Sequence, residues 1–245
     1  MVKINKSTVA VPLILEDGNP ANKSSAATRL FESQADEGKL RFKFDNEIYG
    51  DASVKSALAT VQYDKCCFCE SKVGHISHGD VEHFRPKGGY YSQPKEKMNY
   101  PGYHWLAYDF SNLYFSCPIC NQSFKKNFFP LKDERKRVRS HHQKHLLSRE
   151  KPLIIDPAKD NPALHITFDR EVPKALDEKG RTTIQRIGLD RKKLNDYRLT
   201  WYRLYSEIAR YARAGDSESR QLIREAAKPS EAYSLMVRCN FPDLL

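Results

Sequence analysis

Two pairs of cysteines have the spacing of a metal site. Cys66 and Cys69 form one C-x-x-C sequence, and Cys117 and Cys120 form a second. Four thiolates from two such pairs are typical of a closed, tetrahedral zinc site that stabilises a fold. A redox role of the thioredoxin type is the alternative, but it uses one pair in a strand–helix–strand setting rather than two pairs. We therefore predict a structural Zn²⁺ ion held by these four cysteines.

The stretch between the cysteine pairs carries groups suited to hydrolysing a phosphodiester bond. Glu82 and His83 are neighbours in the sequence DVEHFRPK. Hydrolysis needs a base that titrates near neutral pH, which an imidazole provides, and a metal ion that neutralises developing charge. We predict that His83 is the general base, and that Glu82 and Asn121 bind Mg²⁺ or Mn²⁺ through oxygen atoms. Asn112 is expected to orient the His83 ring by accepting a bond from one ring nitrogen, and Lys125 is expected to face the phosphate.

The composition is that of an ordinary globular protein with an excess of positive charge. Of the 245 residues, 40% are apolar and 29% are charged, and the formal net charge is +10. No apolar run approaches the roughly 20 residues that cross a bilayer. The N-terminus also lacks the apolar stretch and cleavage site of a signal peptide. We therefore expect a cytoplasmic protein without a membrane partner.

Much of the positive charge lies in one stretch, residues 125–151, called the basic segment below. It holds ten Lys or Arg side chains against three acidic ones, which leaves a net charge of +7. Such a run is typical either of a solvated helix face or of a surface that contacts phosphate groups. The sequence alone leaves both interpretations open.

Local patterns predict the elements that position the candidate site. Asp51 is expected to cap a helix over residues 51–63, which leads into the first cysteine pair. The piece DVEHFRP is predicted to be a short strand bounded by glycine-marked turns. The piece CNQSFKKNFF is predicted to be a short helix that starts at the second cysteine pair.

The chain beyond residue 140 changes from extended to helical character. HITFDREV is predicted to be a strand, followed by a turn at Gly180. Apolar residues recur at spacings of three and four from Leu194 to Ala212, which predicts one long helix. We divide the chain into a helical or extended region (1–61), a zinc-bracketed core (62–140) and a mainly helical C-terminal region (141–245).

The order of the polar residues resembles the ββα-metal motif of the HNH nucleases. In that family a His at a strand end is the base, an Asn lies in the loop, and a His or Asn binds metal from the helix. The resemblance transfers these roles to His83, Asn112 and Asn121. The acidic residue before the base binds metal in many members, which points to Glu82. A zinc-supported subgroup has C-x-x-C before the base and beside the last ligand, and the match covers residues 66–131.

A closer resemblance extends along nearly the whole chain. CCFCE, VEHFRPK and YHWLAYDFSNLYFSCPICNQSFKKNFFPL look like the HNH nuclease subunit of Septu-type anti-phage systems, which is also found with retrons. The later pieces IIDP, HITFD and GRTTIQRIGLDR look like the same family. The resemblance implies a role in phage defence and an ATPase partner. In retron systems it also implies an assembly with a reverse transcriptase and its msDNA.

Together these observations predict an α+β protein with a zinc-stabilised HNH endonuclease core and mainly helical N- and C-terminal regions. Two alternatives remain: a non-catalytic zinc module that binds nucleic acid through the basic segment, and a scaffold that docks an ATPase. The sequence leaves DNA or RNA open as the substrate. It also leaves open whether Asp80 binds the catalytic ion, and whether residues 181–245 dock the partner or serve only as the protein's own core.

Overall fold

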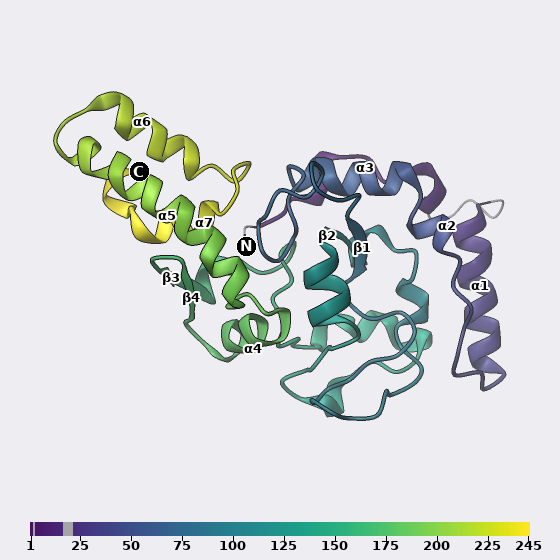
Figure 1. The fold of residues 1–245 in the computed structure, drawn as a ribbon. Coiled ribbons are helices and arrows are strands. Elements are labelled where there is room, and N and C mark those ends of the chain that lie inside the picture. Colours follow the sequence, from purple (N-terminus) through teal and green to yellow (C-terminus); the bar gives the residue numbers. More distant parts are fainter. Residues whose placement is uncertain (2, 17–21) are drawn as a thin grey trace.

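The chain folds as a mixed α/β protein in which two small sheets lie among helices and long loops (Figure 1). The computed structural model describes residues 1, 3–16 and 22–245. The α-helices are α1 (Lys23–Asp36), α2 (Asn46–Tyr49), α3 (Ala52–Val61), α4 (Glu178–Ile187), α5 (Lys192–Arg213), α6 (Ser217–Ala226) and α7 (Ser234–Asn240). The strands are β1 (Asp80–His83), β2 (Leu113–Ser116), β3 (Ile166–Asp169) and β4 (Val172–Ala175). Strands β1 and β2 pair antiparallel, as do β3 and β4.

Side-chain caps determine where several helices begin. The Asp51 carboxylate accepts a bond from the Ser53 N–H at 2.8 Å, so α3 begins at Ala52 and the predicted cap is confirmed. Asp216 caps α6 in the same way, by accepting from the Ser219 N–H at 2.9 Å. A cap of this kind typically contributes about 1 kcal/mol.

The predicted turn at Gly180 is wrong, because this residue lies inside α4 and is buried there. A Cβ atom at position 180 would lie 1.9 Å from the carbonyl oxygen of His165. Glycine is therefore required for the close approach of α4 to the residue that precedes β3. The strand predicted for HITFDREV is present as two strands, β3 and β4, which form a hairpin.

The β1–β2 hairpin brings the two cysteine pairs together. Strand β1 follows the first pair and β2 precedes the second, with Asp80 opposite Ser116. Gln62, at the end of α3, donates to the Phe115 carbonyl at 2.6 Å and accepts from the Phe115 N–H at 2.9 Å. The Cys67 N–H donates to the same carbonyl at 3.0 Å. These bonds hold the first cysteine loop against β2, from which the chain continues directly into the second pair.

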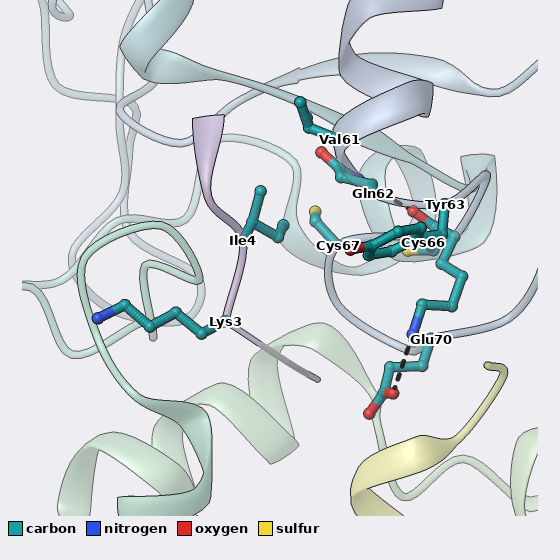
Figure 2. Close-up of a pocket in the computed structure, with 9 residues that line it drawn as sticks. Lys3, Ile4, Val61, Gln62, Tyr63, Cys66, Cys67 and Glu70 are labelled. Atoms are coloured by element: carbon teal, nitrogen blue, oxygen red, sulfur yellow. Dashed lines mark hydrogen bonds and ion pairs between the residues drawn. The ribbon is translucent and has the colours of Figure 1, made fainter. Parts of the chain in front are cut away.

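The N-terminal segment packs against the first cysteine loop, and Figure 2 shows Ile4 beside it. The buried Glu70 carboxylate at the end of this loop pairs with the Met1 ammonium and with Lys65 at 3.5 Å. It also accepts a bond at 3.0 Å from Ser234, the first residue of α7. Burial opposes ionisation, but the two cations still lower the pKa of Glu70 to about 2. The cysteine loop is thus tied to both the N-terminal segment and a C-terminal helix.

A second, smaller core joins helices α5, α6 and α7, which lie together at one end of the molecule (Figure 1). Its buried members are Ala209, Ala212, Ile223, Ala226, Ala227, Val237, Phe241 and Leu244. Nearer the start of α5, the Tyr197 and Leu204 side chains remain 54% and 50% exposed. The apolar stripe of α5 therefore serves only partly as core. Within the described part of the chain, no helix combines the length and apolar character needed to cross a bilayer.

Candidate active site and metal centre

Four cysteine sulfurs converge beside the β1–β2 hairpin. The Sγ atoms of Cys66, Cys69, Cys117 and Cys120 all lie within 4.8 Å of one another, and those of Cys69 and Cys117 are 3.9 Å apart. A tetrahedral zinc with Zn–S bonds of about 2.3 Å would place its sulfurs about 3.8 Å apart. The cluster can therefore bind a metal ion such as zinc. The Arg191 guanidinium, 3.6 Å from the Cys120 sulfur, adds a positive charge beside this thiolate-rich site.

The helix that follows the second cysteine pair carries the predicted ligand Asn121. This helix, η5 (Ile119–Lys125), has backbone bonds of the wider π type. The Asn121 side-chain amide donates to the Asp80 carboxylate at 3.0 Å, and the Gln122 amide donates to the same oxygen at 2.8 Å. Asp80 and Glu82 share one face of β1, because side chains alternate along a strand. The structure therefore brings Asn121 to the acidic face of β1, but its direct partner is Asp80 rather than Glu82.

Lys125 lies inside the protein and not at a phosphate-binding surface. Its side chain is 0% exposed, its ammonium pairs with Glu82, and it donates to the His83 carbonyl oxygen at 3.0 Å. The expectation that Lys125 faces a phosphate is wrong, because a fully buried ammonium already paired with a carboxylate is out of reach of a surface ligand. Lys125 instead joins η5 to the end of β1.

His83 ends β1 in a largely buried site and is 6% exposed. Its Nε2 atom is 2.9 Å from the Ala107 carbonyl oxygen, which can only accept, so Nε2 carries the proton and donates. The edge of the ring contacts the Tyr49 ring at a centroid distance of 4.8 Å. Burial, reinforced by the nearby Lys87 ammonium, lowers the pKa of His83 well below its usual value. The imidazole is therefore neutral at pH 7, and its Nδ1 lone pair faces the Lys87 ammonium at 3.3 Å.

The Asn112 side chain bonds to backbone groups and not to the His83 ring, which corrects the expected bond between them. Its side-chain oxygen accepts from the Arg85 N–H at 2.8 Å, and its amide donates to the Arg85 carbonyl at 3.0 Å and the Leu106 carbonyl at 3.1 Å. Asn112 thus closes the loop between β1 and β2. It acts on the His83 ring only indirectly, by fixing the backbone next to Ala107.

Replacing Asn112 with alanine is expected to lower the free energy of unfolding by about 3 kcal/mol. The change leaves one buried N–H and two carbonyls without this partner, and each such loss costs about 1–3 kcal/mol. Urea denaturation measures the effect. Asn127→Ala is the matched control, because among the described residues the Asn127 side-chain amide has no closer polar partner than the Met98 sulfur at 4.0 Å. Equal midpoints for the two variants would contradict the role assigned to Asn112.

Lys87 is a candidate that the sequence analysis did not assign. Its ammonium lies 3.3 Å from His83 Nδ1 and 4.3 Å from the centre of the Tyr49 ring. Burial lowers the pKa of Lys87 to about 8, although the attraction of Glu82 opposes this shift. The sequence feature that could have identified Lys87 is its position four residues after His83 in DVEHFRPK. The contact of His83 with Ala107 could not be identified from the sequence, because it involves a backbone carbonyl, which every residue has.

A buried polar network supports the loop behind His83. Arg85 pairs with Glu150 at 3.0 Å, and the Tyr103 hydroxyl donates to the same carboxylate at 2.8 Å. Arg137 in turn donates to the Tyr103 hydroxyl at 2.8 Å. Two basic residues of this network therefore have structural partners and do not face solvent.

Most Lys and Arg residues of the basic segment are nevertheless exposed. Of its ten Lys and Arg residues, Lys125 and Arg137 are buried, and the other eight are exposed: Lys126, Lys132, Arg135, Lys136, Arg139, Lys144, Arg149 and Lys151. This exposed charge suits contact with a polyanion.

We predict that acid destabilises the fold, because two histidines are buried in it. Burial lowers the pKa of His104 from 6.5 to about 4 and that of His83 well below 6.5. Below pH 6.5 the unfolded chain binds these protons and the folded chain does not. The free energy of unfolding should therefore fall between pH 7 and pH 5, by up to about 1.4 kcal/mol per pH unit for each histidine. Urea denaturation across this range should show a smaller slope for His104→Phe, and an unchanged slope would contradict the assignment.

Comparison with known proteins gives three relatives. The chain is similar to proteins named Septu protein PtuB. Identity is 37% to the one from Bacillus mycoides (strain KBAB4), over 64% of this chain and 53% of the relative. For the one from Bacillus thuringiensis it is 30%, over 63% of this chain and 49% of the relative. The chain is also 24% identical to Septu protein PtuA of Bacillus mycoides (strain KBAB4), over 59% of this chain and 20% of that protein.

These matches are partial, since the chain spans about half the length of the two PtuB relatives. No protein-family profile matches the chain. No solved structure matches it either.

Proposed function

We propose that the protein is a metal-dependent HNH endonuclease that hydrolyses phosphodiester bonds of nucleic acid. The observation that carries the proposal is the neutral His83 at the end of β1, where it directly follows Glu82 in the sequence. The helix carrying Asn121 reaches Asp80 on the acidic face of β1 and begins at the four-cysteine cluster. The proposed base, the proposed oxygen ligands and the cysteine cluster thus belong to one short hairpin–helix unit.

Zinc is the metal proposed for the four-cysteine cluster. The sulfur separations suit Zn–S bonds, and four thiolates without an open position are typical of structural rather than catalytic zinc. Asn121 follows Cys120 directly in the sequence. Fixing this sulfur therefore also fixes the position from which the Asn121 side chain reaches β1.

Asp80 and Asn121 are the residues proposed to hold the catalytic ion, Mg²⁺ or Mn²⁺. Glu82 is 2% exposed and paired with Lys125, so it would join them only by giving up this partner. The carboxylate and amide oxygens of Asp80 and Asn121 are the hard ligands that these ions prefer. The Asp80 carboxylate is partly exposed and already collects two amide donors, which suits a polar, ligand-accessible position. When bound, the ion neutralises the charge that develops on the phosphate and the leaving oxygen.

His83 acts as the general base in this proposal. Its Nδ1 atom accepts a proton from water while the water oxygen bonds to phosphorus and the bond to the leaving sugar oxygen breaks. Ala107 keeps Nε2 protonated and fixes the ring, so that Nδ1 accepts the proton once the Lys87 ammonium, 3.3 Å away, turns from it to the phosphate. Lys87, which lies beside Nδ1, is placed to hold a phosphate oxygen near the base. Asn112 positions the loop that carries Ala107.

The proposed setting is anti-phage defence together with a PtuA-like ATPase subunit. The similarity to proteins named Septu protein PtuB supports the setting, and the Septu-type sequence motifs imply the ATPase. The half-exposed Tyr197 and Leu204 on α5 make the C-terminal helices the proposed docking surface for this partner. A retron reverse transcriptase with its msDNA is a further partner that the motifs imply.

The experiment is incubation of the purified chain, alone and with a PtuA-like subunit, with plasmid, single-stranded DNA and total RNA. Cleavage that requires Mg²⁺ or Mn²⁺ and stops with chelator is the expected result, and it also identifies the substrate. Binding without cutting would instead favour a non-catalytic zinc module that uses the exposed basic segment. If the assembled complex neither binds nor cuts any of them, the protein is a scaffold and the proposal is wrong.

A further inference from the structure

A second group of metal-ligating side chains lies apart from both the cysteine cluster and His83. It joins Asp36, at the end of α1, to His141 and His142, the first residues of the 3-10 helix η7 (His141–Arg149). Asp36 Oδ1 lies 2.8 Å from His142 Nε2 and 3.6 Å from His141 Nε2, and the three ligand atoms all lie within 4.8 Å of one another. Two imidazole nitrogens therefore converge on a single carboxylate oxygen.

The spacing of these atoms suits a shared ion. Zinc bonds of about 2.0–2.2 Å at tetrahedral angles separate neighbouring ligand atoms by about 3.3–3.5 Å. The two separations from Asp36 Oδ1, 2.8 Å and 3.6 Å, lie on either side of this range. Coordination would need the His142 contact to open by only about half an ångström. A surface hydrogen bond would account for His142, but not for the second imidazole aimed at the same oxygen.

The surroundings of His141 hold its ring in place. His141 is 8% exposed and its ring packs against His104 at a centroid distance of 5.8 Å. His104 in turn lies against Phe42 at 4.6 Å and Trp105 at 4.9 Å. This aromatic wall leaves the edge with Nε2 facing Asp36.

We propose that Asp36, His141 and His142 form a second metal site, for Zn²⁺ or a similar ion such as Co²⁺ or Ni²⁺. Two imidazoles and one carboxylate suit these borderline ions better than Mg²⁺ or Ca²⁺, which prefer oxygen ligands. Three protein ligands leave at least one position for water or a further ligand. Asp36 is 105 and 106 residues before the two histidines, so the ion would tie α1 to the basic segment. The proposal does not depend on nuclease activity.

The test is the number of ions bound by the 245-residue chain after dialysis against Zn²⁺, measured by mass spectrometry of the metal content. Wild type is expected to hold one ion more per chain than His142→Ala or Asp36→Asn. Both substitutions alter exposed side chains, so the variants should fold. The matched control is His145→Ala, an exposed histidine of the same helix that lies outside the cluster, and it should bind as many ions as wild type.

A Ni²⁺ titration gives a second measurement in which the zinc at the cysteines is left in place. Loss of a direct ligand is expected to weaken Ni²⁺ binding by at least the roughly 10–100-fold seen when outer-shell partners are lost. Ni²⁺ should also raise the melting temperature of wild type and His145→Ala, but not that of His142→Ala. Equal metal content and equal Ni²⁺ affinity in wild type and His142→Ala would overturn the proposal.

Discussion

His83→Gln is expected to reduce the rate of nucleic-acid cleavage by about 10²–10⁴-fold, the usual contribution of a general base. Glutamine can still donate a bond to the Ala107 carbonyl, but it supplies no basic nitrogen in place of Nδ1. The loss should therefore appear in the rate of the chemical step. Single-turnover cleavage with the enzyme in excess measures that step directly.

The matched control for this substitution is His75→Gln. His75 is exposed in the loop between the first cysteine pair and β1, so its loss should change neither cleavage nor stability. Melting temperatures of both variants separate a catalytic effect from unfolding. A folded His83→Gln protein that cleaves within about twofold of wild type would contradict the role given to the imidazole.

Cys120→Ser is expected to abolish metal binding at the cysteine cluster and to leave the chain largely unfolded at 37 °C. Structural zinc sites bind with apparent free energies of about 10–16 kcal/mol in small peptides. The whole stability of a typical protein is only about 5–15 kcal/mol. Losing a buried ligand in the first turn of η5 should therefore remove most of the stability of the core. Metal content and thermal unfolding measure the two effects.

Cys239→Ser is the matched control, because Cys239 lies outside the cluster and is half-buried. It should keep the full metal content and change the melting temperature little. Treatment of wild type with a strong chelator should reproduce the Cys120→Ser result. A Cys120→Ser chain with wild-type metal content and melting temperature would contradict the structural role of the cluster.

Features that depend on local sequence were predictable. The spacing of the cysteines predicted the cluster, because two C-x-x-C turns can present four sulfurs to one point once a hairpin joins them. Asp51 was recognised as a cap from the helix pattern that follows it. The strand at DVEH was predicted from its composition and the glycines around it.

Features that depend on long-range packing were not predictable from one sequence. Lys125 was grouped with the basic segment, yet it is buried because Glu82, 43 residues earlier, faces it across the hairpin. The contact of His83 with Ala107 involves a backbone atom, which carries no residue signature. Gly180 was assigned to a turn, although its small size serves the packing of α4 on the His165 carbonyl. In each case the group that determines the contact is distant in the sequence: the Glu82 carboxylate, the Ala107 carbonyl and the His165 carbonyl.

Anomalous diffraction from crystals of the His83→Gln protein grown with Mn²⁺ and an oligonucleotide would locate the catalytic ion directly. We expect a Mn²⁺ peak coordinated by Asp80, Glu82 or Asn121 and in contact with a phosphate of the oligonucleotide. Crystals in which the phosphate lies elsewhere, with Mn²⁺ only at Asp36, His141 and His142 or at no protein site, would contradict a nuclease centre at the end of β1.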